Sequence, residues 1–281
     1  MRFVRVPVRS LLVFAVTVSP MSVGAQQSLQ PVLPSGQSVT PVYEGWYRNK
    51  DGTYSLSFGY FNRNSVERMS IPVGDSNFVS PGTPNQGQPA SFEPRRAWGV
   101  FAVVVPANFG DKAKVTWTLR DRGQTFAISG SLHPDWQIDA IEGEASSDDT
   151  PPVLSFVAGG PEGNGPLGIT SAPVKASVGK PVTLTVIVKD DGKTGATGAN
   201  GVRVGTPVTI AWFPHQGPAD VVFGTPTARL TPTGGTATTT ATFPAAGDYI
   251  VRIRANDSAV ATAGHSQCCW SNGFIKVTVT P

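Results

Sequence analysis

Two adjacent cysteines, Cys268 and Cys269, are the residues whose spacing restricts their chemistry most. Thiols in an oxidising compartment tend to pair, but Cα atoms across a trans peptide lie about 3.8 Å apart, short of the usual disulfide range of about 4.4–6.8 Å. A vicinal disulfide is therefore expected only as a tight ring, forming a rigid apolar feature beside Trp270. Reduced thiols, an intermolecular bridge and a soft-metal site with His265 are the open alternatives. A closed metal site would need further Cys or His ligands, and none lies nearby in sequence.

Acidic and amide side chains form a second group with possible chemistry. They occur in pairs at three separated places in the chain: Asp148 and Asp149, Asp190 and Asp191, and Asn256 and Asp257. Hard oxygen ligands of this kind suit Ca²⁺ if the fold brings them together. The alternative is plain loops, because Asp and Asn are also ordinary turn residues.

Large aromatic side chains in the first half of the chain are candidates for glycan binding, since exposed rings stack on sugars. These candidates are Trp46, Tyr47, Phe61, Trp98 and Trp136. The alternative is that most of them fill a core, where large aromatic residues usually lie. His265 and Trp270, which flank the cysteine pair, are further candidates for a binding surface.

Catalytic motifs are absent from the sequence. The histidines, His133, His215 and His265, lie in separate segments, and neither a zinc-protease motif nor a Gly-x-Ser-x-Gly elbow occurs. Some carboxylates of the first half could pair for glycoside hydrolysis, but that reaction needs a separation which the sequence does not give. These carboxylates are Glu93, Asp135, Asp139 and Glu142. We therefore expect no catalytic residues and no cofactor other than a structural Ca²⁺.

The first 25 residues read as an export signal. Arg2, Arg5 and Arg9 give a positive start, and residues 11–18 form an apolar run that is too short to span a bilayer. Residues 23–25 (VGA) then place small side chains where a signal peptidase reads. An uncleaved anchor is the alternative. We expect cleavage after residue 25 and a periplasmic or extracellular protein with no transmembrane span in its mature chain.

Removing this leader changes the charge of the chain. Three of the 22 Lys and Arg residues lie before residue 26, whereas none of the 19 Asp and Glu residues does, so the remainder is formally neutral. The basic isoelectric point belongs largely to the leader. A neutral body gives no electrostatic reason to expect a nucleic-acid partner.

Short alternating segments predict an all-β fold of two sandwiches in tandem. The 31 glycines and 25 prolines punctuate the chain, and no long segment has a 3.6-residue apolar period. After a loose lead-in at 26–40, residues 41–142 hold hairpin signals around 49–52 and 120–124 and predict an aromatic-rich sandwich. In residues 53–60, the side chains of one face are Tyr54, Leu56, Phe58 and Tyr60. Residues 143–152 (GEASSDDTPP) are polar and predict a linker.

Residues 153–281 predict an immunoglobulin-like sandwich. Strands expected at 182–189, 208–212, 249–255 and 275–279 take the places of strands B, C, F and G. Arg252 and Arg254 are expected on the face opposite the core. Residues 246–257 (AGDYIVRIRAND), together with Trp212, resemble bacterial Ig-like domains of the polycystic-kidney-disease (PKD) type. The resemblance covers residues 173–281 and implies a spacer, adhesin or carbohydrate-binding module, with a tyrosine corner at Tyr249.

These patterns predict an exported, non-catalytic binding or structural protein that acts through sandwich surfaces on a glycan, an envelope component or a protein. A glycan-active enzyme with an Ig-like accessory domain is the first alternative, and a pure spacer or assembly subunit is the second. In an Ig-like sandwich the linker entry and the B–C and F–G loops lie at one end. The three acidic pairs and the cysteines are therefore expected at the junction with the first sandwich.

Overall fold

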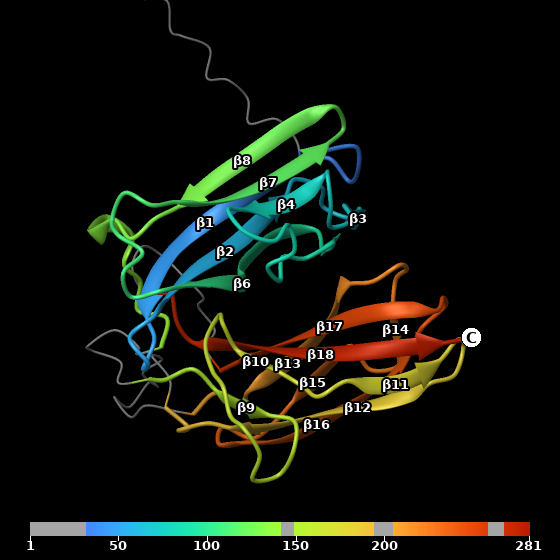
Figure 1. Cartoon of the computed structure of the whole chain (residues 1–281). Helices are drawn as coiled ribbons and strands as arrows, with labels where there is room; N and C mark the ends of the chain where they lie inside the picture. Colours follow the sequence, from blue (N-terminus) through green and yellow to red (C-terminus); the bar gives the residue numbers. More distant parts are fainter. Residues whose placement is uncertain (1–31, 142–148, 194–204, 258–266) are drawn as a thin grey trace, which may run out of the picture. The chain divides into compact units, whose positions relative to one another are not determined.

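The computed structural model describes residues 32–141, 149–193, 205–257 and 267–281 (Figure 1). Its regular structure is β-strand apart from one 3₁₀ turn, η1 (Pro134–Trp136). The predicted all-β fold of two sandwiches is confirmed. In the part of the chain that is described, no helix has the length and apolar character needed to cross a membrane. The predicted leader, Asp148, Glu142 and His265 lie outside the described residues.

The first sandwich packs a β1-β2-β6 sheet against a β4-β7-β8 sheet, with a short β3-β5 pair at one side. Its strands are β1 (Val39–Arg48), β2 (Tyr54–Asn62), β3 (Met69–Ser70), β4 (Asn77–Ser80), β5 (Ser91–Phe92), β6 (Arg95–Val105), β7 (Val115–Asp121) and β8 (Gln124–Gly130). Both predicted hairpins are confirmed: β1 pairs with β2 and β7 pairs with β8, each antiparallel. The first turn closes through hydrogen bonds between Asn49 and Thr53. β1 begins at Val39, two residues before the predicted start of this sandwich.

Aromatic rings fill the core of the first sandwich. Phe58 stacks on Phe101 at 5.4 Å between ring centroids, and Trp117 meets Phe101 edge-on at 5.0 Å. Leu56, Phe58 and Tyr60 from the predicted inward face of β2 are all buried here. Offset and edge-on pairs of this kind add to the free energy gained from burying apolar area.

The second sandwich has the immunoglobulin strand arrangement. Its strands are β9 (Val153–Ser155), β10 (Ile169–Thr170), β11 (Val174–Ser177), β12 (Val182–Lys189), β13 (Thr209–Gln216), β14 (Val222–Phe223), β15 (Thr227–Arg229), β16 (Gly234–Thr242), β17 (Gly247–Asn256) and β18 (Trp270–Thr280). One sheet has the order β14-β16-β12-β9, and the other has β10-β18-β17-β13-β15, with β11 also pairing with β18. β12, β13, β17 and β18 thus occupy the predicted places of B, C, F and G.

Alternation builds the core of this sandwich as the sequence predicts. Leu184, Val186 and Val188 on β12 face Val251 and Ile253 on β17, and all five are buried. The predicted tyrosine corner is also confirmed. The hydroxyl of Tyr249 donates to the carbonyl oxygen of Ala245 at 2.9 Å, which ties the start of β17 to the preceding turn.

The outer face of β17 differs from a solvent-exposed polar face. Arg252 lies opposite the core as predicted, yet it is only 3% exposed. Its guanidinium lies 4.7 Å from the centroid of the Phe213 ring and donates to Oδ1 of Asn272. The reason is that the first sandwich covers this face, which no local pattern in the sequence indicates.

Candidate functional site

The two sandwiches meet through buried hydrogen bonds on one side of β13. The carbonyl oxygen of His215 accepts from the backbone N–H of Ala90 at 2.6 Å, and its Nε2 lies 2.7 Å from the carbonyl oxygen of Gly87. Next to it, Nε2 of Gln216 donates to the carbonyl oxygen of Gln88. Burial, reinforced by the charge of Arg252, lowers the pKa of His215 to about 3. This histidine is therefore neutral in the folded protein, and its role at the junction is structural.

A second set of contacts joins the start of β18 to the first sandwich. Nδ2 of Asn272 donates to the carbonyl oxygen of Gly99 at 2.6 Å, and Nε2 of Gln267 donates to that of Glu44 at 2.8 Å. The indole of Trp270, 2% exposed, lies directly against the Cα of Gly99. All of these groups are buried, so the junction is held by directional bonds as well as by packing.

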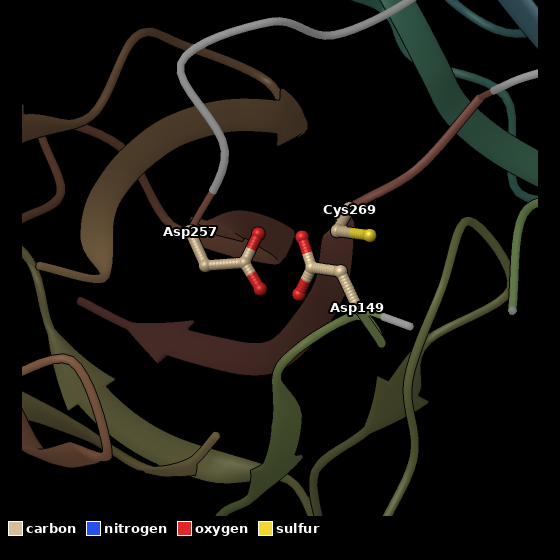
Figure 2. A group of neighbouring side chains, drawn as sticks. All are labelled: Asp149, Asp257 and Cys269. Atoms are coloured by element: carbon tan, nitrogen blue, oxygen red, sulfur yellow. The ribbon is translucent and has the colours of Figure 1, made fainter. Parts of the chain in front are cut away.

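Strand pairing next to this junction brings three carboxylates together. Asp190 follows the end of β12, which pairs with β9, so the segment before β9 places Asp149 nearby. Asp257 follows the end of β17, and its backbone N–H bonds to the carbonyl oxygen of Cys269 at the start of β18. Figure 2 shows the carboxyl groups of Asp149 and Asp257 pointing toward one another, close to Cys269. One oxygen of each carboxyl group and the Cys269 sulfur lie within 4.8 Å of one another.

Burial makes the charge of this acidic cluster (Asp149, Asp190 and Asp257) unfavourable. Asp149 is 3% exposed and Asp257 is 1% exposed. Desolvation, followed by the charges of Asp149 and Asp190, raises the pKa of Asp257 to about 9. Desolvation also raises the pKa of Asp190, whose side chain lies within hydrogen-bonding reach of Asp257. A proton on Asp257, or a cation beside it, would relieve this repulsion at neutral pH.

The structure separates the sequence candidates for calcium into two groups. Asp149 and Asp257 converge, and Asp190 lies beside Asp257. Asp191 is exposed and points elsewhere: it accepts from Thr150 and from the backbone N–H of Lys193. Asn256 is half-buried, and its carbonyl oxygen accepts from the hydroxyl of Thr209. Asp148, the sixth candidate, lies outside the described residues.

Cys268 and Cys269 form a disulfide in the structure, and both are buried. The Cys269 sulfur beside the acidic cluster is therefore not a thiolate, and the ligands that the cluster offers are oxygens. The sequence predicts the cysteine pair and the acidic pairs at one end of the second sandwich. The register of β17 and β18, which pairs Asn256 with Trp270, places Cys269 beside Asp257.

The aromatic candidates do not form one exposed platform. Tyr47 is buried, and its hydroxyl accepts from the backbone N–H of Leu167. Phe61 and Trp98 are half-buried, with the guanidinium groups of Arg95 and Arg96 over their rings.

Trp136 is the candidate with a largely exposed ring, at 49%. It lies at one edge of the first sandwich with the half-buried Trp46, because the Trp46 indole N–H and the Trp136 backbone N–H both donate to the carbonyl oxygen of His133.

The carboxylates whose residue types suit glycoside hydrolysis have other surroundings in the structure. Glu93 forms an ion pair with Arg68 at 2.8 Å. Asp135 and Asp139 are exposed, and Asp135 lies 3.6 Å from Nδ1 of His133. Glu142 is outside the described residues.

A cleft of about 220 Å³ opens beside His215 at the junction. Its walls are Ser70, Ala90 and Ser91 from the first sandwich and residues 214–220 from the second. This volume is below the roughly 300–1,000 Å³ of typical small-molecule sites.

No protein-family model matches the chain, and no curated protein matches it. Among solved structures, the chain is similar to the D00–D0 domain of Intimin, at 12% identity and a TM-score of 0.28, covering 87% of this chain and 100% of that one. WR4, an MSP family member of C. elegans, is 8% identical with a TM-score of 0.25, covering 38% and 92%. An endo-fucoidan hydrolase of glycoside hydrolase family 107 is 12% identical with a TM-score of 0.24, covering 87% and 29%. At these TM-scores the similarities support no conclusion about function.

Proposed function

We propose that this chain is an exported, non-catalytic binding or structural protein that presents the surfaces of two β-sandwiches as one unit. Its partner class is a glycan or a protein of the cell envelope. The observation that carries the proposal is the junction, where His215, Gln267 and Asn272 are buried and hydrogen-bonded to the first sandwich. Such bonds fix an orientation between modules, because breaking one leaves a buried polar group unsatisfied.

The surface that best fits a glycan is the edge carrying Trp46 and Trp136. A sugar ring could stack on the exposed Trp136 indole, whose other neighbour is the Tyr43 ring at 5.5 Å. Because Trp46 is bonded to the same turn, the aromatic edge is held in place before any ligand arrives. Pre-organisation of this kind reduces the entropy lost on binding.

Binding of the mature chain to insoluble peptidoglycan and to a panel of soluble polysaccharides tests this proposal. We expect Trp136→Ala to weaken retention about tenfold, as expected from losing roughly 1.4 kcal/mol of ring contact. The matched control is Val66→Ala, which removes a 72% exposed apolar side chain elsewhere on the first sandwich. Release of reducing sugar from any polysaccharide would contradict the proposal and support the glycan-active enzyme. Equal retention of both variants would exclude the Trp136 edge as the binding surface.

A further inference from the structure

Asp257 presents an electrostatic problem that its protein neighbours leave unsolved. It is 1% exposed, and no N–H or hydroxyl group of the described residues donates a hydrogen bond to either of its carboxylate oxygens. Oδ1 of Asp190 is likewise buried without a donor among these residues, while its Oδ2 accepts from the backbone N–H of Gly192 at 3.0 Å. A buried carboxylate with no donor costs several kcal/mol unless a proton or a cation neutralises it.

The nearest basic side chain in sequence does not neutralise the cluster. Lys189, the last residue of β12, directs its Nζ to Glu162. Within the described residues, no ion pair is formed by Asp190 or Asp257. Figure 2 shows the carboxyl group of Asp257 turned toward that of Asp149, and an oxygen of each lies within 4.8 Å of the other.

We propose that Asp149 and Asp257 bind one Ca²⁺ ion at the junction end of the second sandwich, with the negative charge of Asp190 beside Asp257 adding to the attraction. The donors are carboxylate oxygens, and the sulfur beside them is locked in a disulfide, so the site selects a hard cation over a soft one. Two carboxylates supply up to four oxygens, in one- or two-oxygen contacts, and water completes the six to eight ligands that Ca²⁺ takes. Mg²⁺ fits less well, because it requires near-ideal octahedral geometry and keeps its water.

The site is also placed where a cation would order the chain. Asp149 precedes β9, Asp190 begins the loop after β12, and Asp257 begins the loop after β17. One ion held by Asp149 and Asp257 would therefore cross-link the entry segment and the loop after β17. The bond from Thr150 to Asp191 already holds the entry segment against the β12 loop, which brings Asp149 to the site before the ion binds.

Thermal unfolding of the mature chain with CaCl₂ and with EDTA tests the proposal. The weakest class of calcium sites binds at about 10⁻⁴–10⁻³ M, so the titration extends to about 10 mM. At roughly ten to a hundred times Kd, we expect Ca²⁺ to raise Tm by about 3–10 °C. Isothermal titration calorimetry should give one ion per chain, and MgCl₂ at the same concentration should give a smaller shift.

Asp257→Asn keeps the shape of the side chain and removes its charge, so we expect it to abolish the calcium response. Asp149→Asn is the second variant, in case the first fails to fold. The matched control is Asp248→Asn, which removes one charge from the same strand region at an exposed position bonded to Thr278. It should keep the full response.

Two outcomes would overturn the proposal. Superimposable melts in CaCl₂ and EDTA, with no calorimetric binding, would mean that the cluster is neutralised by a shared proton. An undiminished response in both Asp257→Asn and Asp149→Asn would place the calcium site elsewhere.

Discussion

Gly99 offers a direct test of the packing between the two sandwiches. It lies in β6 with φ +47°, and a Cβ added there would be 2.6 Å from Cζ2 of Trp270 and 3.0 Å from its Nε1. The indole cannot retreat easily, because it is buried beside the disulfide. Gly99→Ala therefore forces either the β6 backbone or the start of β18 to move.

The expected cost has two parts. A left-handed backbone costs an L-residue about 1–2 kcal/mol, and overpacking a filled interface adds about 1–3 kcal/mol. The loss in free energy of unfolding should thus be about 2–5 kcal/mol. Gly110→Ala isolates the first part, because Gly110 has φ +80° and nothing within 4 Å of the added Cβ.

Urea unfolding of both variants, followed by circular dichroism and tryptophan fluorescence, measures the difference. We expect Gly99→Ala to be less stable than Gly110→Ala by about 1–3 kcal/mol, which is the overpacking part alone. Changes in the unfolded chain affect both variants alike and cancel in this comparison. If the two variants have equal stability, the contact between β6 and Trp270 is not packed as described, and the argument for a fixed junction fails.

Two further predictions concern the junction. His215 is protonated below about pH 6.5 in the unfolded chain but only below about 3 in the folded protein, so acid favours unfolding. Between pH 7 and pH 5, the free energy of unfolding of the wild type, measured by urea titration, should fall by about 2 kcal/mol more than that of His215→Gln. A difference in free energy of unfolding between the two proteins that does not change with pH would contradict the burial of His215. Reduction of the denatured chain should add two hydrogen masses for Cys268 and Cys269 without changing the oligomeric state. A dimer that dissociates on reduction would show instead that the cysteines link two chains.

Alternation made the strands of the second sandwich predictable. A strand between two layers buries every second side chain, so the spacing of Leu184, Val186 and Val188 reveals its inward face without knowledge of the rest of the fold. The same logic fails for the opposite face of β17. Alternation places Arg252 away from the core but cannot say whether water or another module lies there, since that depends on contacts across more than a hundred residues of chain.

The acidic cluster was predictable only in part. Its convergence followed from the immunoglobulin topology, which brings the linker entry and two loops to one end. The choice between Asp190 and Asp191 could not be predicted, because adjacent residues at the start of a loop point in directions that are set by the turn itself. Here the backbone N–H groups of Gly192 and Lys193 each hold one of these carboxylates, and only Asp190 is left with an oxygen facing Asp257.

The junction and the acidic cluster belong to one mechanical unit because they share the start of β18. Asp257 bonds to the backbone of Cys269, the next residue is Trp270, and Trp270 lies against Gly99 of the first sandwich. A change in the spacing between Asp257 and its neighbours therefore acts on the same few residues that carry the contact between modules. Since the disulfide removes freedom from this segment, little of such a movement could be absorbed locally. It follows that a cation at the cluster would stabilise the junction as well as the loops, and that Gly99→Ala should reduce the calcium-dependent rise in Tm along with the stability itself.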